Sequence, residues 1–345
     1  MVSTPPPLIR LSPELLARSA RHAARVVARA RLRRVRLAAP SHEAPLGEDA
    51  LHDFRVALRR LRTWLRAFRP ELGDTVGRGT PRRLRRLSQR SGLARDLEVQ
   101  VLWLTHPTVR LGPLATGAAA SLATRLESEQ AGALTKALEE IAESLPRAGS
   151  KLDKQLRRYE VLVPLDASRD EPSMAVAMGR LLREGTALVR LTLDRVTAAE
   201  QALEAHQARL AVKHLRYLLE SMGTVHRGGP RAADRLAGMQ DALGVLHDRH
   251  VLAARVAEEM ALPREGTPLP PTRRALAALH AALERSASRE FQKARRIANG
   301  RAFRAALVTV DRLATALAGV GAADAPEAAG ATPTSAAPAP PPDQP

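Results

Sequence analysis

The sequence HDFRVALRRLR at residues 52–62 recurs as HQARLAVKHLR at residues 206–216, an offset of 154 residues. A second match follows each copy at an offset of 152 residues, where SGLARDLEV at residues 91–99 corresponds to LGVLHDRHV at residues 243–251. A period of this length is far greater than that of the known solenoid repeats. The repeat therefore predicts one molecule made of two pseudo-symmetric halves.

Placed on an α-helix, each copy of the first motif has an apolar face and a separate basic face. At about 100° per residue, the basic positions of the first copy fall within an arc of roughly 80°. The basic stripe of the first copy consists of His52, Arg55, Arg59, Arg62 and Arg66. The second copy repeats it with His206, Arg209, Lys213 and Arg216, and ends at Glu220.

Two interpretations of these stripes are open. Most runs of charge are solvated surface, and either stripe taken alone is compatible with that. However, like charges three and four residues apart repel each other, and almost no acidic residue offsets them on this face. Binding of an extended anion would explain both the crowding and the repetition. Arginine suits such an anion because its planar guanidinium binds phosphate through two hydrogen bonds and stays charged.

The composition indicates an all-α protein with an anionic partner. The chain has 345 residues, 2% aromatic residues, no cysteine and a formal net charge of +18. Residues 1–100 alone hold 22 Lys and Arg against 9 Asp and Glu. The lack of cysteine fits a reducing compartment, and no stretch has the length or apolarity of a signal peptide or a membrane span. We therefore expect a cytoplasmic protein without a membrane partner, whose oligomeric state the sequence leaves open.

Proline and glycine positions divide the chain into two sets of four helices. The predicted helices cover residues 13–37, 49–69, 81–105, 115–145, 172–197, 200–223, 231–261 and 272–318. The halves are then residues 12–145 and 172–318, joined by a connector at 146–171. Residues 321–345, with 7 Pro and 9 Ala, cannot bury enough apolar surface to order themselves and are predicted to be disordered.

The second motif of each half combines arginines, a mid-helix glycine and a repeated aspartate. From the arginine-rich stretch at residues 82–95, Arg83, Arg86 and Arg90 are assigned to the basic surface. Gly92 and Gly244 would cost about 1 kcal/mol each relative to alanine, so close packing is the favoured reason for them. Asp96 and Asp248 are interpreted as residues that orient neighbouring arginines, in preference to metal ligands or general bases.

The motifs H-x2-R-x3-R-R-L-R and H-x2-R-x3-K-H-L-R-Y, followed by LARDLEV and LGVLHDRHV, resemble the CHAD domain, the conserved histidine α-helical domain. The resemblance covers about residues 12–318. It implies two pseudo-symmetric four-helix bundles that form one domain around a basic groove or pore, which binds inorganic polyphosphate, and an association with polyphosphate granules. The polyphosphate-binding residues that it implies are His52, Arg55, Arg59, Arg60, Arg62, His206, Arg209, Lys213 and Arg216. To these we add Arg66, Arg83, Arg86, Arg90 and His214, although His214 stands where the family often has a more basic residue.

Two other functions are alternatives to non-catalytic polyphosphate binding. The dipeptides His52-Asp53 and His247-Asp248 resemble those of helical metal-dependent phosphohydrolases, but neither is kept in the other copy, and the stripes offer too few carboxylates for Mg²⁺. Nucleic acid would bind weakly and non-specifically through counterion release. Single-strand recognition uses exposed aromatic rings, for which Tyr217 is the only candidate beside a stripe. We therefore expect no catalytic residue, no metal and no cofactor.

Overall fold

The computed structural model describes residues 10–40, 50–161, 171–223, 228–261 and 272–323. These residues form α-helices and no strand, apart from one isolated bridge between Ser19 and Ser173. The all-α prediction is confirmed. Within the described residues no helix combines the length and the apolarity needed to cross a membrane.

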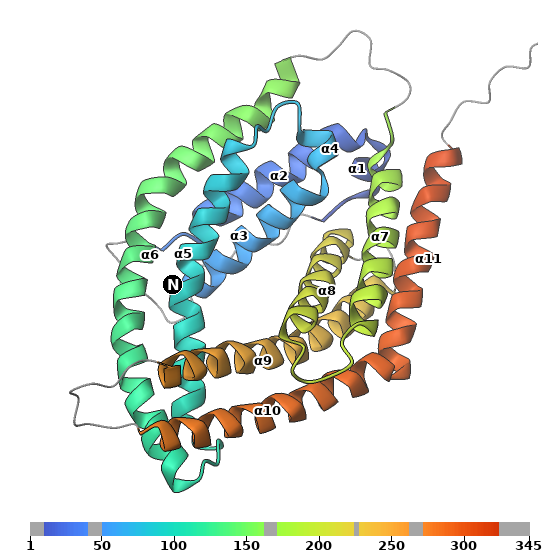
Figure 1. Ribbon diagram of the computed structural model, residues 1–345. Coiled ribbons are helices and arrows are strands. Elements are labelled where there is room, and N and C mark those ends of the chain that lie inside the picture. The colour runs from blue at the N-terminus through green and yellow to red at the C-terminus, as the bar shows by residue number, and fades with distance from the viewer. Residues whose placement is uncertain (1–9, 41–49, 162–170, 224–227, 262–271, 324–345) are drawn as a thin grey trace, which may run out of the picture.

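The first half of the chain contains helices α1 to α6 (Figure 1). Their bounds are α1 Pro13–Ala17, α2 Ala20–Leu37, α3 Ala50–Ala67, α4 Arg69–Leu72, α5 Gly79–Thr105 and α6 Pro113–Val161. The second half has α7 Met174–Asp194, α8 Ala202–Met222, α9 Gly229–Ala261, α10 Arg273–Asn299 and α11 Arg301–Ala323. By order and length, α2, α3, α5 and α6 correspond to α7, α8, α9 and the pair α10 and α11, so the predicted repeat of four helices is present.

Local sequence explains where two of the predicted helices are interrupted. The predicted helix 13–37 is divided between α1 and α2, where the Ser19 hydroxyl accepts a hydrogen bond from the His22 backbone N–H and starts a new helix. The predicted helix 272–318 is divided at Gly300, whose extended backbone ends α10 before α11 begins. Helix α11 continues to Ala323, so residues 321–323 of the predicted disordered tail are helical, and residues 324–345 lie outside the described residues.

The predicted end of a helix at residue 145 is wrong, because α6 runs through Pro146 to Val161. A proline inside a helix removes one hydrogen bond and costs about 3 kcal/mol in an isolated helix. Here Leu145, Ala148 and Leu152 are all buried in the core on both sides of the proline. Tertiary packing outweighs the local penalty, so residues 146–161 are helix and not connector.

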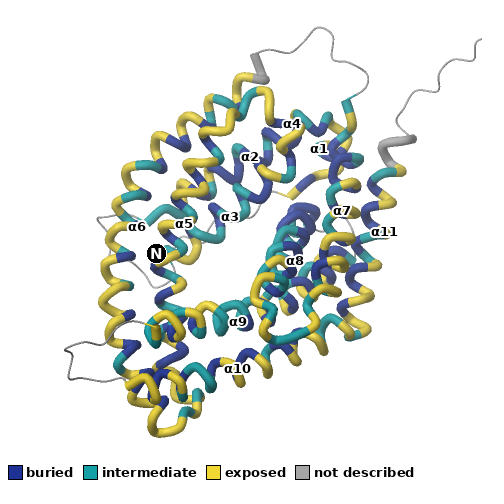
Figure 2. Tube along the Cα trace, viewed as in Figure 1, coloured by how far each residue is buried: buried dark blue, intermediate teal, exposed yellow. Residues whose placement is uncertain are grey.

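The two halves share their apolar cores. The largest core cluster combines residues of α2, α3 and the end of α6 with residues of α7, α8 and α11, among them Trp64 and Leu215. A second cluster joins α5 and the start of α6 to α9 and α10, through residues such as Leu122 and Leu279. The halves are therefore one packed unit and not two separate bundles. Figure 2 shows that α8 is largely buried or intermediate, whereas the long helix α6 has an exposed outward side.

Candidate functional site

Helices α3 and α8 contact each other and bring the two basic stripes together. The surroundings of Lys213 in α8 show that the two stripes are close together. Burial disfavours the charged form of Lys213 and nearby guanidinium groups repel it, so its pKa falls to about 7. The guanidinium groups responsible belong to Arg209 in the same half and to Arg59, Arg62 and Arg66 in the other half. We call Arg55, Arg59, Arg62, Arg66, Arg209 and Lys213 the central basic cluster.

The central basic cluster has almost no acidic compensation. Among the described residues, the only ion pair that any of its six members makes is that of Arg55 with Asp96, at 3.9 Å between Nη2 and Oδ1. The Nε atoms of Arg55 and Arg209 are buried and have no hydrogen-bond partner in the described part of the chain. Positive charge held this close, and left uncompensated, makes a surface suited to an anion.

The repeated glycines have the same role in both halves. A Cβ atom built on Gly92 of α5 would lie 3.6 Å from Nη1 of Arg55, and one built on Gly244 of α9 would lie 3.7 Å from Nε of Arg209. A cluster arginine of α3 or α8 therefore lies beside each glycine, at a distance that would also accommodate a Cβ atom. Close packing was the expected reason for them, and the group that approaches is an arginine side chain.

These distances give a prediction for Gly92. Gly92→Ala is expected to be tolerated and to raise the free energy of unfolding by up to about 1 kcal/mol, because 3.6 Å is ordinary van der Waals contact and alanine favours helix. Gly92→Leu is expected to displace Arg55 and to weaken anion binding. Urea denaturation and a binding titration of both variants would check this, and equal anion affinity in the two would contradict it.

The repeated aspartates lie near this cluster. The side chain of Asp96 is 65% accessible to solvent, and its partial desolvation by the neighbouring helices raises its pKa, against the opposing effect of Arg55 and Arg209. Burial also raises the pKa of Asp248, and the negative charge of Asp96 adds to that shift. The two carboxylates are therefore close enough to influence each other. Among the described residues, no group of three or more His, Asp or Glu side chains is arranged to hold a metal ion.

The histidines of the two copies differ in their surroundings. His52 is exposed at the start of α3. His206 is partly buried and its ring lies 4.7 Å from that of His247, centroid to centroid. Burial and then the positive charge of Arg209 lower the pKa of His206, while burial and neighbouring cations lower the pKa of both His214 and His247 to about 4. His214 and His247 are therefore neutral near pH 7.

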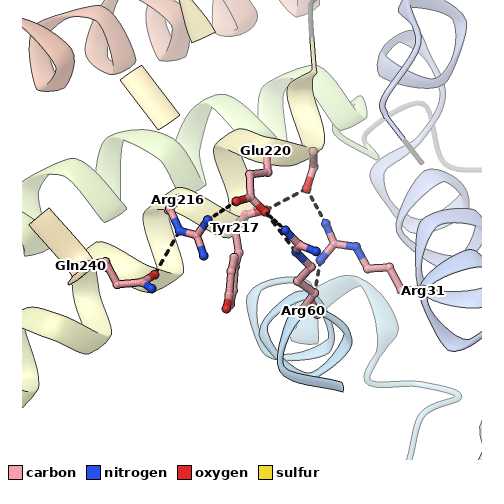
Figure 3. A network of polar contacts seen from close by, with 7 residues as sticks. Arg31, Arg60, Arg216, Tyr217, Glu220 and Gln240 are labelled. Atoms are coloured by element: carbon pink, nitrogen blue, oxygen red, sulfur yellow. Dashed lines mark hydrogen bonds and ion pairs between the residues drawn. The ribbon is translucent and has the colours of Figure 1, made fainter. Parts of the chain in front are cut away.

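Arg60 and Arg216, both predicted to bind the anion, are engaged in an ion-pair network between the halves (Figure 3). Glu220 pairs with Arg60 of α3 at 3.0 Å and with Arg216 of its own helix. Arg31 of α2 completes the network, since it donates to the Arg60 carbonyl and to the Ser221 hydroxyl. Burial, foremost, lowers the pKa of Arg31 to about 9, and the charge of Arg60 adds to this while Glu220 opposes it. This network fastens α2 and α3 to α8.

Tyr217 is not the exposed ring that the sequence suggested. It is only 3% exposed, and the guanidinium carbons of Arg60 and Arg216 lie 5.7 Å and 4.8 Å from its ring centroid. Trp64 and Phe68 are fully buried. The stripes therefore present no aromatic platform on which bases could stack.

The arginines of α5 differ in whether they line a cavity beside α3. Arg82 and Arg85 line a cavity together with Arg62 and Arg66 of α3. The residues predicted for the site, Arg83, Arg86 and Arg90, are exposed and do not line that cavity. These five arginines share one broad arc of the helix, so helical spacing alone does not indicate which of them line the cavity. The cavity also includes Arg69 and Arg78, which the sequence analysis missed because they lie outside the repeated motifs.

Comparison with known proteins agrees with this architecture. The family model described as the CHAD domain matches residues 26–257. The fold is similar to that of the crystal structure of the CHAD domain from the plant Ricinus communis, with 21% identity and a TM-score of 0.62, covering 89% of this chain and 97% of that chain. It is also similar to PptA from Streptomyces chartreusis, with 22% identity and a TM-score of 0.60, covering 84% of this chain and 99% of that chain. No curated protein matches the chain. Because the family model covers well over half of the sequence, including both basic motifs, the chain belongs to the CHAD domain family.

Proposed function

We propose that this protein binds inorganic polyphosphate at the central basic cluster and does not degrade it. The observation that carries the proposal is the crowding of Lys213 by arginines from both halves, while Asp96 is the only carboxylate paired with the cluster among the described residues. A linear polymer of phosphate places many charges along one path, so it can neutralise cations of α3 and α8 together. Membership of the CHAD family, and the resemblance of its motifs, support this choice of anion.

The kinds of residue in the cluster support binding without hydrolysis. Hydrolysis of a phosphoanhydride needs a positioned nucleophile and usually metal ions that clamp the developing charge. The cluster supplies cations along the whole stripe, and these stabilise the bound ground state as well as any transition state. Purified protein incubated with polyphosphate and Mg²⁺ or Mn²⁺ should release no more phosphate than a denatured control. Release that Asp96→Asn or Asp248→Asn abolishes would overturn this part of the proposal.

The binding test compares a long phosphate chain with orthophosphate and with DNA of either strandedness. We expect long chains to bind far more tightly than orthophosphate, with an affinity that falls steeply with salt. If about six phosphates are neutralised, the slope of log K against log salt should be about −4, as for single-stranded polyanions. Equal affinity for orthophosphate and polymer would overturn the proposal, and displacement of polyphosphate by DNA at equal phosphate concentration would favour a nucleic-acid-binding function instead.

We further propose that the protein acts in the cytoplasm, on polyphosphate granules. A fluorescent fusion should gather on the granules in cells that accumulate the polymer. It should become diffuse when the polymer is depleted or when the central basic cluster is neutralised. A fusion that stays diffuse in polymer-rich cells would remove this part of the proposal.

Lys213 should make binding depend on pH. In the free protein its pKa is about 7, and a bound polyanion would favour the ammonium form, so binding above pH 7 takes up a proton. The affinity is therefore fully present below about pH 7 and is expected to fall by about tenfold between pH 7 and about pH 9. Lys213→Arg, which stays charged, should remove most of this fall. An unchanged pH profile in that variant would show that Lys213 is not in contact with the polymer.

A further inference from the structure

An open cavity of about 760 Å³ lies where the end of α3, the short helix α4 and the first turns of α5 meet. Arg62 and Arg66 belong both to its lining and to the central basic cluster, so the cavity continues that cluster toward α4 and the start of α5. The arginines that line it are Arg62, Arg66, Arg69, Arg78, Arg82 and Arg85. We call this cavity the arginine pocket.

The charge of the arginine pocket is uncompensated. No Asp or Glu is among its lining residues, and none of its six guanidinium groups forms an ion pair with any described residue. The pKa of Arg62 is lowered to about 10, mainly by burial and further by the positive charges of Arg66 and Arg85. The guanidinium groups of these three arginines are therefore close enough to repel one another. Several guanidinium groups that line one cavity, without a carboxylate among them, attract an anion of matching charge.

Helix α5 adds to the positive potential of the pocket. It has 27 residues and begins at Gly79, directly after the pocket residue Arg78. Arg78 makes no side-chain capping bond, and the first turn contains no acidic residue. The backbone N–H groups at this end carry the positive end of the helix dipole and favour phosphate oxygens.

The positions of the second half that are equivalent to the six arginines are not arginine-rich, so the repeated motifs do not account for the arginine pocket. At the two offsets of the repeat, the positions equivalent to the six arginines hold Arg216, Glu220, Gly223, Pro230, Asp234 and Ala237. The single cation among them, Arg216, is paired with Glu220. The six positions are all positively charged in the first half, whereas their equivalents in the second half have a net negative charge. The repeat alone would give a symmetric site, and the chain departs from it here.

We propose that the arginine pocket is a second anion subsite, which takes consecutive phosphoryl groups of the chain beyond Arg66. This proposal rests on the proposed function, and it adds that the polymer runs asymmetrically, from the central basic cluster into the first half. In the second half Glu220 ends the stripe, and the ion pairs of Arg60 and Arg216 with Glu220 leave no equivalent path.

The test uses inorganic tripolyphosphate as a short probe, alongside long-chain polyphosphate, in calorimetric titrations of the full chain. Arg78→Ala/Arg82→Ala removes two charges that belong to the pocket alone. Arg83→Ala/Arg86→Ala is the matched control, since it removes the same charge from exposed positions of the same helix outside the pocket. Thermal unfolding should show both variants folded, because none of the four side chains is buried.

We expect Arg78→Ala/Arg82→Ala to weaken tripolyphosphate binding by about tenfold and the control to change it by less than about twofold. A third variant, Arg59→Ala/Lys213→Ala, should keep tripolyphosphate binding and lose long-chain affinity. The proposal is overturned if the pocket variant and its control bind tripolyphosphate equally, or if only the third variant loses it. Should long chains bind no better than orthophosphate while tripolyphosphate binding still depends on Arg78 and Arg82, the proposed function fails and the subsite stands.

Discussion

Replacing Arg59, Arg62 and Lys213 together by alanine is expected to weaken the binding of long-chain polyphosphate by about 100-fold. Each side chain is a cation without a carboxylate partner in the described structure, so its contacts with the polymer are not balanced by the loss of an internal ion pair. A loss of roughly 1 kcal/mol for each charge-assisted contact gives about 3 kcal/mol in total, which corresponds to about 100-fold in affinity. Titration at fixed salt would measure it.

The control for this variant removes the same number of charges elsewhere. Arg83, Arg86 and Arg90 are exposed on α5 and do not line the cavity, so their triple alanine variant should lower affinity by less than about fivefold, through net charge alone. Both triple variants should keep their helical circular dichroism, because all six positions lie outside the apolar core. Equal losses of affinity in the two variants would show that only net charge matters and that the central basic cluster is not the site.

Glu220→Gln is expected to lower the free energy of unfolding by about 3 kcal/mol, because removing one partner of a poorly hydrated ion pair leaves the other charges uncompensated. The side chain of Glu220 is only 17% exposed and pairs with Arg60 and Arg216. Arg31, whose pKa is already lowered to about 9, would lose the nearby negative charge that opposes this shift. The loss should be visible in urea denaturation and as a lower melting temperature.

Glu143→Gln is the matched control for Glu220→Gln. Glu143 pairs with Arg147 one turn later in α6, and its side chain is 71% exposed. Exposed pairs of this kind contribute about 0.5 kcal/mol or less, so this variant should unfold almost like the parent protein. If both glutamine variants unfold alike, the network around Glu220 does not fasten the halves together.

The helices of the fold could be predicted from the sequence because their apolar residues recur with helical spacing. Residues such as Phe54 and Leu61 are buried, as their positions on the apolar face of the first motif indicate. The path of α6 through Pro146 could not be predicted, because it depends on a core that distant parts of the chain complete. Helical spacing reports which residues share a face, but it does not report which neighbour supplies the packing energy.

Only part of the candidate site could be predicted from the sequence. The repeated motifs indicated Arg59, Arg62 and Lys213, which the structure brings together across the two halves. They also indicated Arg60 and Arg216, whose charges are engaged by Glu220. A single sequence shows where a cation is, whereas the partner of that cation depends on tertiary contacts between distant residues, such as Arg60 and Glu220, which are 160 positions apart.

The shared core has an evolutionary consequence. One half alone would expose the apolar residues that the other half covers, so a protein with a single copy of the motifs would be stable only as a two-fold symmetric homodimer. In such a dimer both subunits carry the same residue at every position, and an arginine at one end of the path requires an arginine at the other. Gene duplication and fusion remove that constraint. Arg66 and Glu220 occupy equivalent positions with opposite charge. A fused chain can hold an arginine at one of these positions and a glutamate at the other. Its basic surface can therefore differ in charge between its two ends, which is impossible in a symmetric homodimer.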